Sequence, residues 1–367
     1  MEEKSYYLYG AAIQGIQSFI LQSDELKDIV GASELIEKIC TESFDEFGKV
    51  PNNFVVKVAG NIKYVFDSKA DCERAVLEFP KKVMEQAPGI TVSQAVVTYK
   101  DESNFGEAID GLETKLKAQR NKQISVEPCL MSMRRSRQTG LPVLDVENKE
   151  YLDAGTIAKR SNAKKGNDSS TIALSKKCFG IDKLKHEYIA YDIEQITLKN
   201  NWIAIIHADG NGLGQVVQKL GKDKELFYQF SINLDKATKT AAHIAYQKVS
   251  EKYEFHKLKK IPIRPVVLGG DDLTVICRGD FAVEYTKEFL SAFEEKTREL
   301  LSQILKGVNV FKNGENYLTA CAGIAFIKSS YPFYYGYHLA EELCKTAKKD
   351  AKQDKSSDEL APSCLMF

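Results

Sequence analysis

Two adjacent acidic side chains in the second half of the sequence have the types and spacing of a cation site. Asp271 and Asp272 follow Gly269 and Gly270 in the segment RPVVLGGDDLTVIC (264–277), where apolar, β-forming residues lie on both sides. The pattern predicts a β-hairpin with the two carboxylates at its tip. Adjacent like charges repel each other, so the aspartates do not stabilise the hairpin. A solvent-exposed turn is the alternative, because Gly and Asp are common turn residues.

A third aspartate follows another apolar run. Asp209 ends this run in NWIAIIHADGNGLGQVV (201–217), and a glycine-rich turn and a helix-compatible stretch come next. The turn has no GK[ST] sequence and departs from the dinucleotide-binding pattern, so its position is its main signal. Backbone N–H groups at a helix start suit phosphate oxygens, and glycines let a nucleotide approach the backbone closely. His207, two residues before the aspartate, is expected to pack rather than to catalyse.

These features together predict a metal-dependent reaction. Hard cations such as Mg²⁺ or Mn²⁺ prefer carboxylate oxygens and offset the repulsion between the acids. Two such ions roughly 4 Å apart would activate a hydroxyl and neutralise a leaving pyrophosphate, as phosphoryl or nucleotidyl transfer requires. The residues predicted to be catalytic and metal-binding are Asp209, Asp271 and Asp272. The residues beside them that are predicted to bind the nucleotide are Gly210, Asn211, Gly212, Gly269 and Gly270.

The order of elements around the aspartates occurs a second time in the first third of the chain. Both copies read strand, helix, hairpin, helix, strand and helix, which predicts an α+β sandwich with helices on one face of the sheet. Aligning glycine with glycine places Ala12, Asn61 and Ile62 opposite the first, second and third aspartate. The first copy therefore keeps the predicted fold without the three acids. This difference favours metal binding over a simple turn.

The repeat predicts three parts of the chain. They are a degenerate domain over 1–125, an irregular basic insertion or linker over 126–198, and an acid-bearing domain over 199–367. The middle part contains positive clusters and the flexible-linker signal GNDSS. These clusters are RRSR (134–137), KR (159–160), AKKG (163–166) and KK (176–177). Two interpretations stay open: the bases contact a nucleotide or a polynucleotide activator, or the segment is a solvated insertion.

Composition limits the classes of protein to consider. The chain has 367 residues, of which 43% are hydrophobic and 28% charged, and its formal net charge is zero. These values are typical of a globular protein with room for two domains, without a global basic field that would attract nucleic acid. No apolar run has the length of a membrane span, and the N-terminus is not a secretory signal. Eight cysteines without a C-x-x-C pair indicate free thiols in the reducing cytoplasm.

Several of these segments resemble one known family. GGDD in its strand–turn–strand, ADGNGLG before it, and TACAGIAF and PFYYGYHLAEELCKTAKK after it look like the second palm domain of the CRISPR polymerase family. This family includes the large subunit of type III CRISPR effector complexes. GIQSFILQSDELKDIVGASELIE resembles the first palm, with AGNIKY as a degenerate hairpin. The resemblance covers 5–125 and 200–367 and implies two tandem ferredoxin-like palm domains, the first degenerate and the second with the GGDD hairpin.

The resemblance also implies a reaction and further site residues. ATP, or another nucleoside triphosphate, would be joined 3′–5′ into cyclic oligoadenylates or related cyclic nucleotides as an antiviral second messenger. The acid-free palm would hold the acceptor nucleotide near Gly15, Ser33 and Gly60, for which tight packing is the alternative. A more distant likeness to GGDEF diguanylate cyclases places Lys348 of LCKTAK where a lysine reaches the nucleotide phosphates. An exposed helix face is the alternative for this lysine.

Departures from the family affect the expected partners. The sequence has no adjacent His-Asp pair, only Cys129 stands where a cysteine cluster is common, and no helical docking domain follows SCLMF. These differences favour a standalone signalling enzyme or a palm-only fragment. An RNA activator, CRISPR or other defence proteins, and a second copy of the chain in a homo-oligomer all remain open as partners. The alternative function is a catalytically silent nucleotide-binding or scaffold subunit of a CRISPR-type complex.

Overall fold

The computed structural model consists of two compact units. Unit 1 comprises Met1–Ser23, Lys27–Lys165 and Gly221–Tyr228, and unit 2 comprises Asp24–Leu26, Gly166–Leu220 and Gln229–Phe367. The residues that the structure describes are 5–58, 60–101, 104–120, 131–164, 172–197, 201–220, 223–308, 311, 315–353 and 359–367. Cys129 and the GNDSS stretch lie outside the described residues.

Unit 1 contains a four-stranded antiparallel sheet with the strand order β2-β3-β1-β4. Its elements follow the predicted order of strand, helix, hairpin, helix, strand and helix. They are β1 (Tyr6–Gln14), α1 (Ile16–Ile20), α2 (Leu26–Lys38), the π-helical turn η1 (Ile39–Ser43), the 3₁₀ turn η2 (Pro51–Asn53), β2 (Phe54–Val58), β3 (Asn61–Phe66), α3 (Lys69–Gln86), β4 (Thr91–Tyr99) and α4 (Phe105–Arg120). The buried rings of Tyr9, Phe44 and Phe79 pack together in its core.

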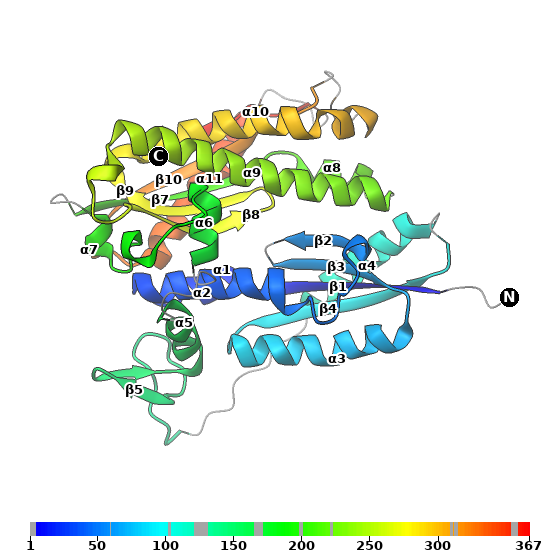
Figure 1. The fold of residues 1–367 in the computed structure, drawn as a ribbon, viewed down its shortest axis with the longest axis horizontal. Coiled ribbons are helices and arrows are strands. Elements are labelled where there is room, and N and C mark those ends of the chain that lie inside the picture. The colour runs from blue at the N-terminus through cyan, green and yellow to red at the C-terminus, as the bar shows by residue number, and fades with distance from the viewer. Residues whose placement is uncertain are drawn as a thin grey trace. The chain divides into compact units, whose positions relative to one another are not determined.

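Unit 2 has a sheet with the strand order β11-β10-β7-β9-β8. Its elements are β7 (Trp202–Gly210), α8 (Leu213–Leu220), α9 (Lys224–Lys252), η6 (Phe255–Lys257), β8 (Ile263–Gly269), β9 (Asp272–Arg278), η7 (Gly279–Phe281), α10 (Ala282–Val308), β10 (Ala320–Lys328), α11 (Phe333–Lys352) and β11 (Cys364–Met366). Figure 1 shows α9 and α10 side by side, and Lys252 of α9 forms an ion pair with Glu284 of α10. The first residues of α9 are grouped with unit 1.

The two units share one topology, so the predicted α+β fold of two tandem palms is confirmed. The order β2-β3-β1-β4 of unit 1 corresponds to β8-β9-β7-β10 of unit 2, and β11 adds a parallel strand beside β10. In each unit the central strand leads into a helix through a glycine with positive φ. These glycines are Gly15 (φ 66°) and Gly212 (φ 73°).

The hairpin turns correct the alignment of the two copies. Two residues separate the last paired positions of each hairpin, which are Val58 and Asn61 in unit 1 and Gly269 and Asp272 in unit 2. Asn61 therefore corresponds to Asp272, and the expectation that it corresponds to Asp271 is wrong. The strand register shows this directly, whereas the sequence comparison relied on matching one glycine with another.

The two glycines that were matched occupy different places in their turns. Gly60 (φ 81°) is the second turn residue of the first hairpin, whereas Gly270 (φ 63°) is the first turn residue of the second. Aligning them shifted the comparison by one residue, so Ile62 does not correspond to an aspartate. Ala12 stays the counterpart of Asp209, because Ala12 pairs with Asn61 and Ala208, the residue before Asp209, pairs with Leu273, the residue after Asp272.

The segment between the palms contains short elements in its described part. They are β5 (Asp145–Glu147), β6 (Glu150–Leu152), α5 (Ala154–Lys164), α6 (Ala173–Phe179), η5 (His186–Tyr188) and α7 (Ile193–Ile196). Residues up to 165 group with unit 1 and the following residues with unit 2. Buried apolar residues such as Leu152 and Phe179 hold these elements in place. The domain boundaries at 125 and 198 stay predictions.

None of the helices in the described part of the chain is long and apolar enough to cross a membrane.

Candidate active site

The three aspartates lie together at one edge of the sheet of unit 2. Asp209 is the penultimate residue of β7, Asp271 lies in the hairpin turn, and Asp272 begins β9. Because β7 and β9 are antiparallel neighbours, the end of one strand and the start of the other meet at the same edge. One carboxylate oxygen from each residue lies within 4.8 Å of the other two. Residues that are about sixty positions apart in the sequence therefore form one cluster.

The carboxylates are half-buried and perturb one another. Burial and the charge of Asp209 raise the pKa of Asp271 to about 7. Burial, followed by the charges of Asp271 and Asp209, raises the pKa of Asp272 well above its ordinary value. Three acids at these distances repel one another when ionised, and a bound divalent cation would remove this repulsion. The oxygen-only donor set fits Mg²⁺ or Mn²⁺.

Lys348 of α11 reaches the same cluster. Its Nζ lies 2.5 Å from Oδ2 of Asp209 and donates a hydrogen bond of 2.8 Å to the carbonyl oxygen of Gly210. The lysine can reach so far because α11 packs very closely on β10 at Gly323. A Cβ atom at this glycine would lie only 2.0 Å from the carbonyl oxygen of Ala340. A residue without a side chain is therefore needed to place the lysine.

The turn after β7 is held by hydrogen bonds of a buried residue, Asn211. Asn211 is only 1% exposed, and its side-chain amide donates hydrogen bonds to Thr319 Oγ1 (3.0 Å) and to the carbonyl oxygen of Pro362 (3.3 Å). Its backbone N–H donates to the carbonyl oxygen of Thr319 (2.8 Å). The side chain predicted to bind nucleotide therefore anchors the turn. Any contact of Asn211 with a nucleotide would be indirect, through the turn that it holds.

The glycines around the acids leave room for the backbone and for a ligand. A Cβ atom at Gly210 would lie 2.9 Å from Cβ of Asp271, so glycine lets the two turns approach each other. Gly269 forms the last pair of its hairpin with Asp272. Gly270 has a positive φ, and a Cβ atom there would meet no heavy atom within 4 Å. The tip of the hairpin is thus open beside the carboxylates.

Two residues that sequence reasoning missed support the site. Thr238 of α9 is fully buried, and its hydroxyl donates a hydrogen bond of 2.6 Å to the carbonyl oxygen of Gly270. Tyr337 of α11 is buried against the ring of His207, and its hydroxyl has no hydrogen-bond partner among the described residues. Burial also lowers the pKa of His207, which bonds to Thr274 (3.0 Å). A threonine or tyrosine within a helical pattern carries no sequence signal for these contacts.

Unit 1 has no matching acid cluster among its described residues. Gly60 accepts a hydrogen bond from Ile13 N (2.8 Å), and its own N–H donates to Cys40 Sγ (3.0 Å). Gly15 has open space around it, because a Cβ atom there would meet nothing within 4 Å. Ser33 is buried, and its hydroxyl donates to the carbonyl oxygen of Ile29 (2.9 Å). Gly15 thus lies directly after β1 and Gly60 lies in the β2–β3 turn, whereas the hydroxyl of Ser33 is bonded to the backbone of its own helix, α2.

Comparison with known proteins places the site in a family. Residues 202–357 match the model of the second palm domain of Cas10/Cmr2. Among solved structures, the chain is similar to the Csm1–Csm4 cassette in complex with AMPPNP, with a TM-score of 0.61 and 16% identity over 95% of this chain and 54% of that one. The cassette in complex with one ATP has a TM-score of 0.59 and 17% identity, over 95% of this chain and 54% of that one. The cassette in complex with cA4 has a TM-score of 0.59 and 16% identity, over 95% of this chain and 53% of that one. No curated protein sequence matches the chain.

The fold and the acid cluster together define a tandem palm protein with acids in its second palm only. Residues 202–357 match the second palm domain of the Cas10/Cmr2 family, so this part of the chain is a Cas10-like palm domain. The whole chain spans about half of the length of the solved chains that it matches. At 16% identity, the likeness to these structures shows the fold alone.

Proposed function

We propose that this chain is a metal-dependent nucleotidyltransferase that joins ATP, or another nucleoside triphosphate, into cyclic oligonucleotides that act as messengers in antiviral defence. The observation that carries the proposal is the convergence of Asp209, Asp271 and Asp272 at one sheet edge of the second palm. The corresponding edge of the first palm has Ala12 and Asn61 in place of two of them. A fold that survives without the acids does not need them for its own stability, so a role in catalysis explains them better.

The three aspartates would hold Mg²⁺ or Mn²⁺. When bound, these ions lower the barrier by activating a ribose hydroxyl and by neutralising the charge of the leaving pyrophosphate. The raised pKa of Asp271 supports this assignment, because the metal-free cluster retains a proton that a cation would displace. The chain contributes the carboxylate geometry, which the β7–β9 register fixes.

Other residues of unit 2 would position the substrate. Lys348 is close enough to the cluster to exchange its contact with Asp209 for a triphosphate oxygen. The backbone of the turn at Gly210 and Gly212 precedes α8 and suits phosphate oxygens. Thr238 would keep the hairpin tip in place through its bond to Gly270. We assign base recognition to none of the described side chains of the site, so the preference for ATP rests on the matched structures.

The acid-free palm would hold the acceptor nucleotide. Gly15 and Gly60 are the residues that fit this role, because both lie at the sheet edge that corresponds to the acid cluster. Ser33 would act only through the packing of α2, since its hydroxyl is already bonded to the backbone. The solved chains that the protein resembles belong to Csm1–Csm4 cassettes, which supports partners of the CRISPR type. An RNA activator and a homo-oligomer stay proposals.

A turnover assay tests the proposal. The protein is incubated with each labelled nucleoside triphosphate and Mg²⁺ or Mn²⁺, and the products are resolved by mass spectrometry. We expect pyrophosphate release and a cyclic product from the wild type and neither from the double variant Asp271→Asn with Asp272→Asn. The matched control replaces two exposed acids of unit 2 whose side chains form no hydrogen bond or ion pair with any described residue, as Asp182→Asn with Glu194→Gln. Turnover in the first double variant contradicts the assignment, and nucleotide binding without turnover in the wild type supports the silent subunit instead.

A further inference from the structure

Unit 1 contains a cavity in the segment that follows its palm. The cavity has a volume of about 350 Å³, and residues between 134 and 152 line it. Three of the lining side chains are cationic and one is aromatic: Arg134, Arg137, Lys149 and Tyr151. A volume of this size accommodates a ligand as large as a nucleotide. The reaction proposed for unit 2 makes no use of this cavity.

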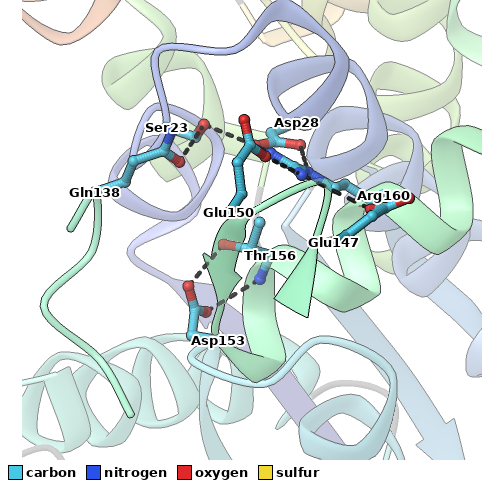
Figure 2. A network of polar contacts seen from close by, with 8 residues as sticks. All are labelled: Ser23, Asp28, Gln138, Glu147, Glu150, Asp153, Thr156 and Arg160. Carbon is cyan, nitrogen blue, oxygen red and sulfur yellow. Dashed lines mark hydrogen bonds and ion pairs between the residues drawn. The ribbon is translucent and has the colours of Figure 1, made fainter. Parts of the chain in front are cut away.

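Glu150 also lines the cavity, and Figure 2 shows that Glu150 and the neighbouring acidic side chains contact Arg160 or Thr156. Arg160 of α5 forms an ion pair with Asp28 of α2 (2.8 Å), and its Nη1 donates to Oε2 of Glu150 (2.5 Å) and lies 3.8 Å from Glu147. The pair of Arg160 (4% exposed) with Asp28 (0%) is shielded from water, whereas Glu147 (36%) and Glu150 (41%) reach Arg160 from the solvent side. The hairpin β5–β6 is thereby fixed on α2 and α5.

Asp153 is engaged in the same way. Its carboxylate accepts hydrogen bonds from the hydroxyl (2.7 Å) and backbone N–H (3.1 Å) of Thr156, as drawn in Figure 2. It also accepts one from the hydroxyl of Thr139 (2.9 Å). Gln138 accepts a bond from Ser23 (3.3 Å), which ties the turn that carries Arg137 to the start of the palm. The network therefore fixes these acids in place, while Arg160 supplies a single positive charge to the carboxylates of Asp28, Glu147 and Glu150.

The cations of the cavity are left without acidic partners. Arg137 and Lys149 form no hydrogen bond or ion pair with any residue of the described chain, and the guanidinium of Arg134 lies 3.5 Å above the ring of Tyr151. Lys149 lies at the tip of the β5–β6 hairpin, where it and Asn148 have positive φ (68° and 48°). Non-glycine residues rarely adopt this conformation, so the hairpin holds Lys149 in place at some cost.

We infer that this cavity binds one phosphorylated nucleotide unit of a single-stranded nucleic acid. Arg137 and Lys149 would contact the phosphate, because both are exposed cations and neither has to break an ion pair with a described residue to bind it. Arg134 and Tyr151 would contact the base, since aromatic rings and guanidinium planes both stack on nucleobases. A neutral chain without a global basic field needs such a local site to bind nucleic acid.

Binding of a short RNA tests the inference. A fluorescently labelled, unstructured ten-nucleotide RNA is titrated with the protein in EDTA, and the anisotropy is recorded at several salt concentrations. EDTA removes divalent cations, so the acid cluster of unit 2 does not contribute. We expect the double variant Arg137→Ala with Lys149→Ala to bind about tenfold more weakly than the wild type. The slope of log K against log salt should fall by about 0.7, because each neutralised phosphate of a single strand contributes about 0.7 and the cavity would hold one phosphate.

Matched controls separate this site from general charge effects. Lys49→Ala with Lys117→Ala removes two exposed cations of unit 1 that have no partner in the described chain, and it should leave affinity nearly unchanged. Asp271→Asn with Asp272→Asn should also bind RNA as the wild type does, whether or not the proposed reaction occurs. Equal losses in the two cation variants, no RNA binding by the wild type, or equal competition by inorganic polyphosphate would overturn the inference. Preference for an acidic peptide over the RNA would overturn it as well.

Discussion

Replacing Asp271 with Asn should stabilise the metal-free protein. The carboxyl group has its pKa raised from the ordinary 3.8 to about 7 by burial and by Asp209. One pKa unit corresponds to about 1.4 kcal/mol, so ionising this group in the folded protein costs about 4 kcal/mol before screening. Coulomb's law gives about 3.5 kcal/mol for two charges at 4.8 Å and an effective dielectric constant near 20. Partial exposure to water reduces either value to about 2 kcal/mol.

The pH dependence has a definite sign. Because the folded state holds this proton more tightly than the unfolded state, the group stabilises the protein at acidic pH. That stability is lost as the pH rises from about 4 through about 7. In EDTA at pH 7.5, Asp271→Asn should therefore raise the melting temperature by about 4–8 °C. The melting temperature of the variant should also decrease less than that of the wild type as the pH rises from about 4 through about 7. Added Mn²⁺ should stabilise the wild type and not the variant.

Thermal unfolding monitored by circular dichroism, with and without Mn²⁺, checks this reasoning. Asp182→Asn serves as the control, because the exposed side chain of this unit 2 aspartate forms no hydrogen bond or ion pair with a described residue and its loss should change neither curve. A lower melting temperature of Asp271→Asn in EDTA, or equal stabilisation of both proteins by Mn²⁺, would refute the idea of a repulsive cluster that a cation relieves.

Three further changes test the surroundings of the site and of the segment between the palms. Gly323→Ala places a Cβ atom 2.0 Å from the carbonyl oxygen of Ala340, so we expect a loss of about 2 kcal/mol or more in chemical denaturation. Thr238→Val removes the bond to the Gly270 carbonyl and should weaken Mn²⁺ binding in calorimetry by about 1 kcal/mol without lowering the melting temperature by more than a few degrees. Burial lowers the pKa of Lys159 to about 8, so the folded state binds fewer protons than the unfolded state between pH 8 and 10.5, and wild-type stability should rise over that range. Lys159→Met should be about 2 kcal/mol more stable than the wild type at pH 7, and its stability should not increase between pH 8 and 10.5. The same increase of stability in the variant as in the wild type would contradict the lowered pKa of Lys159.

The sequence alone was enough to find the two palms and the acid cluster. Alternation of apolar residues and turn signals give local elements directly, and the same order of elements occurs twice. Asp209 at a strand end and the Asp271–Asp272 pair at a hairpin tip had to meet once β7 and β9 paired. These features depend on local pattern and on simple rules of strand pairing, both of which the amino-acid order encodes.

Only the tertiary structure decided which side chains face the site. Asn211 follows the acid in sequence, yet its side chain points inward because Thr319 and Pro362 supply its partners from more than a hundred residues away. Thr238 supports the hairpin from a helix with no motif of its own. Arg160 meets Asp28 across 132 residues, and this pairing leaves the cations of the cavity free. Such contacts depend on packing between distant segments, whose energies a linear pattern does not record.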